Sequence, residues 1–222
     1  MIKDDRMRTI YGMVRAGVTV CDVGTDHAHI PIELILSGKA PRCIITDISA
    51  PSLEKGIANA RIAGCGDKIS SYCANGTLGV PLDNDMDVII AGMGGELISD
   101  ILRQDKRLRS NAYGFVLQPM SKPEALRSFL AENGFEMIDE VKTEALGRVY
   151  AVIKCRYTGK AYKLTEREIY LGCFTRSDAP LEKRYAEKVI SSLETRLEGL
   201  KRSDTVNEAE ISQLEHLISE IK

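Results

Sequence analysis

The sequence predicts an α/β fold: a doubly wound sheet with an antiparallel edge hairpin, followed by a C-terminal helical hairpin. Three observations lead to this prediction. Short apolar runs alternate with segments of helical period between residues 18 and 134, the pattern of parallel strands joined by crossover helices. Two segments of alternating polarity follow, at 135–144 and 149–157, and fit a hairpin. Beyond residue 157, leucine and isoleucine recur every three or four positions among charged residues, which indicates paired helices.

The strands of the parallel part are expected at the apolar runs 18–23, 42–48, 68–73, 86–91 and 113–118. Four of these runs are too apolar to have a solvated face, as expected for a parallel sheet that is covered on both sides. Segment 68–73 contains two serines and is the least apolar. We therefore expect it at an edge of the sheet.

Proline and glycine mark the ends of two crossover helices, one from Pro31 to Gly38 and one from Pro51 to Gly64. A third helix is expected to end at Gly134 and to begin at a capping box formed by Ser121 and Glu124. The C-terminal helices are expected on either side of a break at Ser203-Asp204. Their arrangement resembles a short coiled coil, and we expect domains at 1–157 and 158–222.

Composition excludes several classes of protein. With 44% hydrophobic and 28% charged residues, the 222-residue chain is not expected to be disordered, collagen-like or embedded in a membrane. The first residues lack the apolar core of a signal sequence, so a cytoplasmic location is expected. Six cysteines occur singly and without a histidine cluster, which argues against a metal site and against a disulfide framework. The net charge of -2 provides no global positive field for a nucleic acid.

The turn after the first strand is the first candidate site, because in a doubly wound sheet this turn holds a nucleotide-like cofactor. Gly24 lets a ligand approach the backbone, but Asp26 and Ala28 occupy positions where a dinucleotide site has glycine. A carboxylate there would repel a pyrophosphate. It suits a cofactor that carries positive charge, which favours S-adenosylmethionine over a nicotinamide cofactor.

The ends of the next two strands fit the adenosine part of such a cofactor. Asp47 is placed to accept hydrogen bonds from ribose hydroxyls, although it also fits a helix cap. Ile48 would lie against the adenine, and Asn75 would point to the edge of the base or act as a turn residue.

The fourth and fifth strands end at the same edge of the sheet. Gly92, Gly94 and Gly95 leave bare backbone that suits a flat ring, although one of them would be enough for a tight turn. Gln118 follows at the end of the fifth strand, with its side-chain amide aimed at the same crevice.

Four motifs, DVGTDHAHIP, ITDI, IIAGMGGELI and LQPM, resemble the bacterial tRNA (adenine-22, N1)-methyltransferase family of the TrmK type. The resemblance is close over residues 1–157 and agrees only in kind over the C-terminal helices. It implies a class I methyltransferase with a Rossmann-like sheet. It also implies S-adenosylmethionine as methyl donor and N1 of a tRNA adenine as acceptor.

The resemblance also assigns cofactor residues. The methionine side would be lined by Asp22, Gly24, Thr25, Asp26 and His27, the adenosine held by Asp47 and Ile48, its base flanked by Asn75 and Gly76, and the methyl-transfer crevice formed by Ala91, Gly92, Met93 and Gly94. Two positions depart from the family pattern. Ala74-Asn75-Gly76 replaces Gly-Asp-Gly, and Met120 replaces the asparagine of Gln-Pro-Asn.

The candidate catalytic residues follow from the charge that develops on the methylated base. Asp26 and the side-chain carbonyl of Gln118 would stabilise that charge. His27 or His29 would accept a proton, and each also fits a helix-start residue bonded to backbone.

Because the net charge is slightly negative, tRNA binding requires a local basic surface beside the crevice. The candidates are Arg103, Lys106, Arg107 and Arg109 in one cluster, and Lys183, Arg184, Lys201 and Arg202 in another. Both clusters also fit ordinary solvated faces. The helical hairpin would grip the tRNA or dimerise, so a monomer and a weak dimer both remain open. The alternative functions are methylation of another RNA, a protein or a small molecule, and a non-catalytic binding module.

Overall fold

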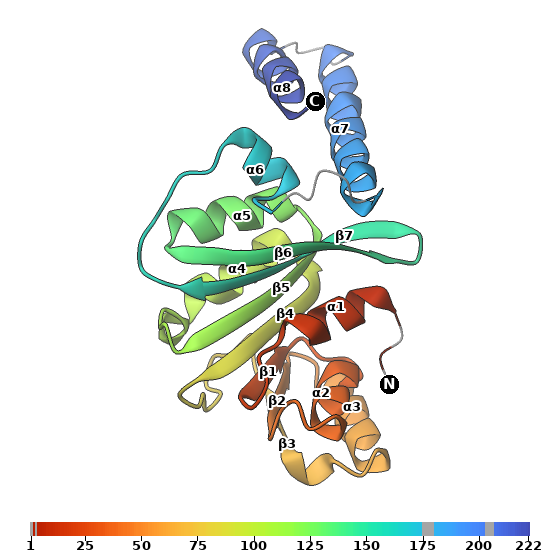
Figure 1. The fold of residues 1–222 in the computed structure, drawn as a ribbon, viewed down its shortest axis with the longest axis vertical. Helices are drawn as coiled ribbons and strands as arrows, with labels where there is room; N and C mark the ends of the chain where they lie inside the picture. Colours follow the sequence, from red (N-terminus) through yellow and green to blue (C-terminus); the bar gives the residue numbers. More distant parts are fainter. Residues whose placement is uncertain (1, 3, 175–179, 203–206) are drawn as a thin grey trace.

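The computed structural model describes residues 2, 4–174, 180–202 and 207–222. In this part of the chain, seven strands form one mixed sheet in the order β3-β2-β1-β4-β5-β7-β6 (Figure 1). The strands are β1 (Thr19–Val23), β2 (Cys43–Asp47), β3 (Ile69–Cys73), β4 (Met86–Gly94), β5 (Tyr113–Ser121), β6 (Phe135–Ala145) and β7 (Arg148–Tyr157). Strands β1 to β5 pair in parallel, whereas β7 pairs antiparallel with both β5 and β6. The predicted doubly wound sheet with an antiparallel edge is confirmed, and β3 is an edge strand.

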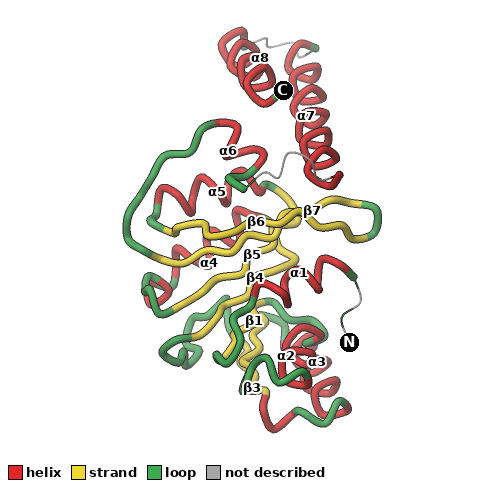
Figure 2. Tube along the Cα trace, in the orientation of Figure 1, coloured by secondary structure: helices red, strands yellow, loops and turns green. Residues whose placement is uncertain are grey.

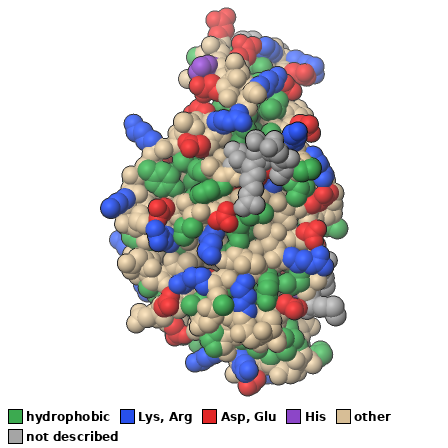
Figure 3. Space-filling model, viewed as in Figure 1, with side chains coloured by type: hydrophobic (Ala, Val, Ile, Leu, Met, Phe, Trp, Pro, Cys, Tyr) green, Lys and Arg blue, Asp and Glu red, His purple; other side chains and the backbone are tan. Residues whose placement is uncertain are grey.

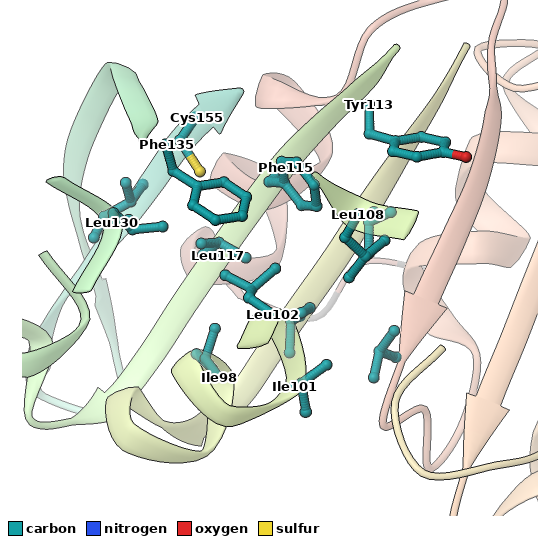
Figure 4. Close-up of a cluster of buried hydrophobic side chains, with 14 of the residues drawn as sticks. Ile98, Ile101, Leu102, Leu108, Tyr113, Phe115, Leu117, Leu130, Phe135 and Cys155 are labelled. Carbon is teal, nitrogen blue, oxygen red and sulfur yellow. The ribbon is translucent and has the colours of Figure 1, made fainter. Parts of the chain in front are cut away.

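Helices cover both faces of the sheet (Figure 2). One face is covered by α1 (Asp5–Met13), α2 (His29–Leu36) and α3 (Ala50–Ile62), and the other by α4 (Gly95–Gln104) and α5 (Pro123–Glu132). Two short 3₁₀ helices, η1 (Gly66–Lys68) and η2 (Lys106–Leu108), precede β3 and β5. Figure 4 shows the core on the α4 side, where Leu102 faces Phe115 and Phe135. The Phe115 and Phe135 rings meet edge to face at 5.5 Å.

Helix α1 was not expected from the charged N-terminal residues. Its N-cap is Asp4, whose side chain accepts a hydrogen bond from the Met7 backbone N–H at 2.8 Å. Its apolar side buries Ile10 and Met13 against the sheet. The intervals of three and four residues between Met7, Ile10 and Val14 were the signal that could have predicted it.

Two predicted helix starts need correction. The Ser121 and Glu124 capping box is wrong, because β5 extends through Ser121, which pairs with Gly94 of β4. Helix α5 instead follows Lys122, which has a φ of 51° and makes no side-chain cap. Helix α2 begins at His29, two residues before Pro31.

The C-terminal segment forms α6 (Glu166–Leu171), α7 (Pro180–Lys201) and α8 (Glu208–Ile221), which confirms the predicted helical hairpin. A capping box does occur here, between Thr165 and Glu168 at the start of α6. The three helices share a small apolar core of Leu171, Leu193, Leu214, Ile218 and Ile221. The predicted break at Ser203-Asp204 lies outside the described residues.

Tyr162 and Ile169, which follow the edge hairpin, contact the sheet domain. The Tyr162 backbone N–H donates to the Ala131 carbonyl at 3.0 Å, and Arg127 of α5 donates to the Ile169 carbonyl of α6 at 2.6 Å. Within the ranges that the structure describes, no helix combines the length and apolar character needed to cross a membrane.

Candidate cofactor and methyl-transfer site

The candidate site lies at the carboxyl ends of β1 and β4, where α1 closes a cavity of about 240 Å³. Helix α1 contributes Arg6 and Ile10, the turn after β1 contributes Asp22 and the residues that follow it, and β4 contributes Ala91 and Gly92. The cavity therefore brings together two of the predicted strand ends, together with a helix that the sequence analysis missed.

The turn after β1 is shaped by Gly24, which has a φ of 78°. Its N–H donates to the Thr46 carbonyl at 2.8 Å, which ties the turn to the end of β2. A β-carbon at this position would collide with the methyl group of Met93, because that side chain lies directly over Gly24. Glycine is required here both for its backbone conformation and for space.

Asp22 lies beneath this turn and is only 8% exposed. Burial raises the pKa of its carboxyl to about 7, and the hydrogen bond that it accepts from the Thr25 hydroxyl offsets part of this effect. The ligand-free site therefore holds a carboxyl that is readily ionised by a nearby positive charge. Such a group suits the ammonium of an amino acid.

Asp26 and the histidines lie at the mouth of the cavity. The two Asp26 carboxylate oxygens face Lys55 Nζ at 3.4 Å and His27 Nε2 at 3.1 Å. The His27 ring stacks on His29 with 5.3 Å between ring centroids. The Asp26 carboxylate is thus shared with two basic side chains, and its catalytic role stays a prediction.

The ends of β2 and β3 follow β1 in the sheet, next to this cavity. The Asp47 backbone carbonyl accepts a hydrogen bond from the Ala74 N–H at 3.0 Å, which holds the ends of β2 and β3 together. Asp47 Oδ1 accepts a hydrogen bond from the Ser49 N–H at 2.8 Å, and Ser49 is the N-cap of α3. Ile48 beside it is 75% exposed, an unusual position for a large apolar side chain and one that suits contact with a flat base.

Asn75 and Gly76 differ in their surroundings. Asn75 is exposed, and its Nδ2 donates to Gln104 Oε1 at 3.4 Å. Gly76 is buried, has a φ of 63°, and its carbonyl accepts from the Thr46 hydroxyl at 2.9 Å. Gly76 is therefore a structural residue of the loop, whereas the Asn75 side chain is accessible to a ligand.

Gln118 is completely buried, and its amide already has partners. Its Oε1 accepts from Arg6 Nη1 at 2.8 Å and from the Gly92 N–H at 3.1 Å, while its Nε2 donates to the Pro119 carbonyl at 2.9 Å. This geometry suits a residue that positions the β4 end and Arg6. The contact of Gln118 with the reacting base stays a prediction.

The first predicted basic cluster does not line this cavity. It begins in the last turn of α4 and lies beside the loop after β3, because Arg107 Nη2 donates to the Thr77 carbonyl at 2.5 Å. Arg103 pairs with Asp100, and Arg107 pairs with Asp105 while donating to the Val80 carbonyl at 2.9 Å. None of Arg103, Lys106, Arg107 and Arg109 lines the cofactor cavity, and their contact with tRNA stays a prediction.

The second predicted cluster lies on α7. Lys183 and Arg184 are exposed near its start, and Arg184 pairs with Glu144 of β6 at 2.7 Å. Lys201 and Arg202 at its end pair with Glu215 and Glu198. Figure 3 shows that basic side chains on this face are interspersed with acidic ones.

A second cavity of about 420 Å³ lies between the end of β5 and α7, and the sequence analysis did not anticipate it. We call it the interdomain cavity. Three basic side chains and one acidic side chain line it, together with apolar and aromatic groups: Lys122, Lys188, Arg196 and Glu124. Met120 also lines it, and Met120 Sδ lies 3.7 Å from Arg6 Nη1 of the cofactor cavity. Arg6 therefore stands between the two cavities.

The residues present fit S-adenosylmethionine. A buried carboxyl at Asp22, bare backbone at Gly92 with no atom closer than 3.9 Å to a β-carbon there, and an exposed apolar side chain next to the Asp47 carboxylate provide surroundings for an ammonium, a thioether chain and an adenosine. Among the residues that the structure describes, no group of His, Cys, Asp or Glu side chains is arranged to hold a metal ion.

Comparisons with known proteins point to the same class of enzyme. Residues 3–153 match the model of the methyltransferase domain family. Over 149 residues the chain is 31% identical to the tRNA (adenine(22)-N(1))-methyltransferase of Bacillus subtilis, which covers 67% of this chain. The match spans 62% of that relative, less than two thirds of its length.

Solved structures extend the similarity to the whole chain. A candidate tRNA (m1A22) methyltransferase of Streptococcus pneumoniae is 27% identical, with a TM-score of 0.87 and coverage of 100% of this chain and 98% of that one. The same protein in complex with S-adenosyl-L-methionine matches at 26% identity and a TM-score of 0.82, covering 97% of each chain. The fold of the C-terminal helices is therefore shared with these structures as well.

Proposed function

The chain belongs to the TrmK-type family of tRNA (adenine-22, N1)-methyltransferases, and from this premise we propose that it transfers a methyl group from S-adenosylmethionine to N1 of adenine 22 in tRNA. The observation that carries the proposal is the crevice at the carboxyl ends of β1, β2 and β4. There, the bare backbone of Gly24 and Gly92 lines the same cavity as the Asp22 carboxyl, and Asp47 ends the neighbouring strand β2.

Cofactor binding would be divided among three strand ends. Asp22 would pair with the ammonium of the amino acid part, because its raised pKa falls when a positive charge approaches. Asp47 would accept hydrogen bonds from the ribose through Oδ2, which has no partner among the described residues. Ile48 would cover the adenine, and Asn75 would reach its edge.

When bound, S-adenosylmethionine supplies an electrophilic methyl group and leaves as a neutral thioether, so no covalent enzyme intermediate is required. The protein mainly orients the adenine and excludes water. Gln118 would hold the Gly92 backbone at the end of β4 through its 3.1 Å hydrogen bond. Asp26 would stabilise the positive charge that develops on the methylated base, with His27 as the nearest group to take up a proton.

The interdomain cavity is the best candidate for the tRNA contact surface. It adjoins Arg6, and three of its four charged lining residues are basic, so it provides the local positive surface that the net charge of -2 requires. Lys183 and Arg184 would extend this surface along α7. In this arrangement residues 1–157 hold the cofactor and residues 158–222 form an arm that grips the tRNA.

The proposal is tested with two in vitro transcribed tRNAs that differ at one base. One carries adenine at position 22 and the other guanine. We expect methyl incorporation from labelled S-adenosylmethionine only into the first, and mass spectrometry of the digested RNA should detect 1-methyladenosine. Equal incorporation into both transcripts, or incorporation at another base, would contradict the assignment of adenine 22.

Matched variants separate the alternatives. Asp47→Asn should weaken S-adenosylmethionine binding by roughly tenfold, because a charged acceptor for the ribose hydroxyls is lost. Asp67→Asn, at the amino edge of β3, should leave binding unchanged. Cofactor binding without methylation of either transcript would indicate another acceptor. Absence of cofactor binding in calorimetry would indicate a non-catalytic binding module.

A further inference from the structure

The loop after β3, residues 74–80, carries Asn75 and lies between β2 and α4. On the β2 side, the Thr46 hydroxyl donates to the Gly76 carbonyl at 2.9 Å. On the α4 side, a β-carbon at Gly76 would lie only 2.8 Å from Ile101 Cγ2, so the helix packs directly against the loop backbone. The place of the Asn75 side chain therefore depends on how this loop is held.

Asp105 and Arg107, at the start of η2, hold the second half of the loop. The Thr77 hydroxyl donates to Asp105 Oδ2 at 2.6 Å. Arg107 Nη2 donates to the Thr77 carbonyl at 2.5 Å, and its Nη1 donates to the Val80 carbonyl at 2.9 Å. We call Asp105 and Arg107 the loop clamp, because together they bind both the side chain and the backbone of Thr77.

The loop clamp is itself well ordered by charge. Arg107 donates to both Asp105 oxygens, from Nε to Oδ1 at 2.9 Å and from Nη2 to Oδ2 at 2.7 Å. Thr77 is completely buried and Asp105 is only 3% exposed. Burial alone would raise the pKa of Asp105, but the hydrogen bonds from Arg107 and Thr77 outweigh it and lower that pKa. Asp105 is therefore an ionised acceptor, which forms stronger hydrogen bonds than a neutral one.

The residue before the loop clamp reaches the Asn75 side chain. Gln104, the last residue of α4, accepts a hydrogen bond through Oε1 from Asn75 Nδ2 at 3.4 Å. A side-chain amide has two donor hydrogens on its nitrogen and an acceptor oxygen. With Nδ2 turned to Gln104, Asn75 Oδ1 is left to accept from a donor, and the exocyclic amine of adenine is such a donor.

We infer that Asp105 and Arg107 position the loop that presents Asn75 to the adenine, and that they thereby set the preference of the site for adenosine over other nucleosides. The inference rests on the proposed function, because it concerns the base end of the same cofactor. Both are positioning residues, since they act on the cofactor only through the loop.

The test uses two ligands that differ only at the edge of the base: S-adenosylhomocysteine and S-inosylhomocysteine, in which an oxygen replaces the exocyclic amine. Their dissociation constants are measured by calorimetry on the full chain. The wild type should prefer the adenosine ligand by about tenfold or more, because the inosine oxygen cannot donate to Asn75 Oδ1. Arg107→Met should weaken the adenosine ligand by about fivefold or more and the inosine ligand by less than about twofold.

Thr77→Val tests the same connection without removing a charge. It deletes the hydroxyl that donates to Asp105, whereas Asp105 keeps its hydrogen bonds from Arg107. We expect it to reduce the preference for the adenosine ligand in the same direction, and Thr77→Ser, which retains a hydroxyl, should restore it. This variant decides the question if Arg107→Met does not fold, which thermal unfolding without ligand shows.

Two further variants distinguish positioning from a general loss of structure. Asn75→Ala should lose the preference for the adenosine ligand, and adding Arg107→Met to it should change the ratio of the two dissociation constants no further. Lys106→Met is the matched control, because it removes a positive charge from the same 3₁₀ helix, whereas the hydrogen bonds to the loop come from Arg107. It should bind both ligands as the wild type does.

Three results would overturn the inference. They are a loss of affinity by the same factor for both ligands, no change for either ligand, and a rise only in the KM for tRNA, which would assign Arg107 to a phosphate contact. If the wild type bound neither ligand, the proposed function would fail together with the inference. If the ligand pair behaved as expected but neither tRNA was methylated, the role of the loop clamp would stand and the proposed acceptor would fail.

Discussion

Arg127 of α5 and Glu140 of β6 form a two-point ion pair in which both side chains are completely buried, with Nε to Oε2 at 3.0 Å and Nη2 to Oε1 at 2.8 Å. Arg127 Nη2 also donates to the Tyr185 hydroxyl of α7 at 2.9 Å. Burial alone would raise the pKa of Glu140, but the charges of Arg127 and Lys142 outweigh it and hold that pKa below its usual range. The pair connects the sheet domain to the C-terminal helices.

Removing one partner of this pair should be strongly destabilising. Arg127→Met leaves the Glu140 carboxylate buried with Lys142 as its remaining cation, and we expect a loss of about 3–5 kcal/mol in the free energy of unfolding. Urea denaturation measures it. The control is Arg156→Gln, which breaks an exposed pair with Glu136 and should cost less than about 1 kcal/mol. Similar losses in the free energy of unfolding for the two variants would show that the buried pair contributes no more to stability than an exposed pair.

Cofactor affinity should depend on pH through Asp22. Because burial raises the pKa of this carboxyl to about 7, most molecules carry the protonated form in mildly acidic solution. The ionised form binds the ammonium, so S-adenosylmethionine affinity should rise about tenfold between about pH 5.5 and pH 7. Calorimetry measures this, and Asp22→Asn should bind weakly with little dependence on pH. A variant that retained the full pH dependence would assign it to another group.

Ionisation of Asp22 should also lower the stability of the protein without cofactor as pH rises. The pKa of Asp22 is higher in the folded than in the unfolded chain, so its stabilising contribution is complete at low pH and is lost as pH rises to about 7. Asp22→Asn keeps an oxygen acceptor for the Thr25 hydroxyl but does not ionise. Its free energy of unfolding should therefore exceed that of the wild type increasingly between about pH 4 and pH 7. Parallel pH profiles of the two proteins would contradict this.

Substitution of Gly24 should damage both stability and cofactor binding. Gly24→Ala places a β-carbon at a φ of 78° and against the Met93 methyl, and a loss of about 1–3 kcal/mol is expected. The double variant Gly24→Ala/Met93→Ala should recover only the part of the lost stability that is due to the collision with the Met93 methyl. Gly12→Ala is the control, because nothing lies within 4 Å of its β-carbon position in α1, and it should gain about 0.5–1 kcal/mol. Chemical denaturation distinguishes these outcomes.

The turn of the edge hairpin is a site where stability should increase. Ala145 pairs with Arg148, so Leu146 and Gly147 form a two-residue turn, with φ angles of 51° and 73°. Positive φ at both positions favours Asn-Gly, and Leu146 is 98% exposed, so it loses no packing when replaced. Leu146→Asn should raise the free energy of unfolding by about 0.5–1 kcal/mol, measured with urea. Gly147→Ala should lower the free energy of unfolding. If Gly147→Ala were instead more stable than Leu146→Asn, backbone strain in the turn would not determine the stability of these variants.

Much of the fold was predictable because apolar period and turn residues are local properties. The runs at 18–23 and 86–91 are strands because both of their faces are buried, and segment 68–73 lies at an edge because its serines are only partly buried. The start of α5 was not predictable in the same way. Whether Ser121 caps a helix or extends a strand depends on its pairing with Gly94, which is distant in the sequence.

The candidate site was also predictable only in part. The Asp22, Gly24 and Asp47 positions follow from their places at strand ends, because parallel strands bring their carboxyl ends to one edge. The contribution of Arg6 depends on α1 folding back over that edge, more than one hundred residues away in sequence from Gln118, which it contacts. The basic residues 103–109 form a cluster in the sequence, but none of them lines the cofactor cavity, and Arg107 is bonded to Asp105 and to the Thr77 and Val80 carbonyls.

The class of fold, the family and the strand ends of the cofactor crevice were predictable without coordinates, since each of these depends on residues close together along the chain. The three-dimensional packing was needed to establish which cations border the crevice, how Gln118 is bonded and how Arg127 joins the C-terminal helices to the sheet. These relationships depend on contacts between side chains that are far apart in the sequence, and such contacts exist only once the sheet and its helices have packed.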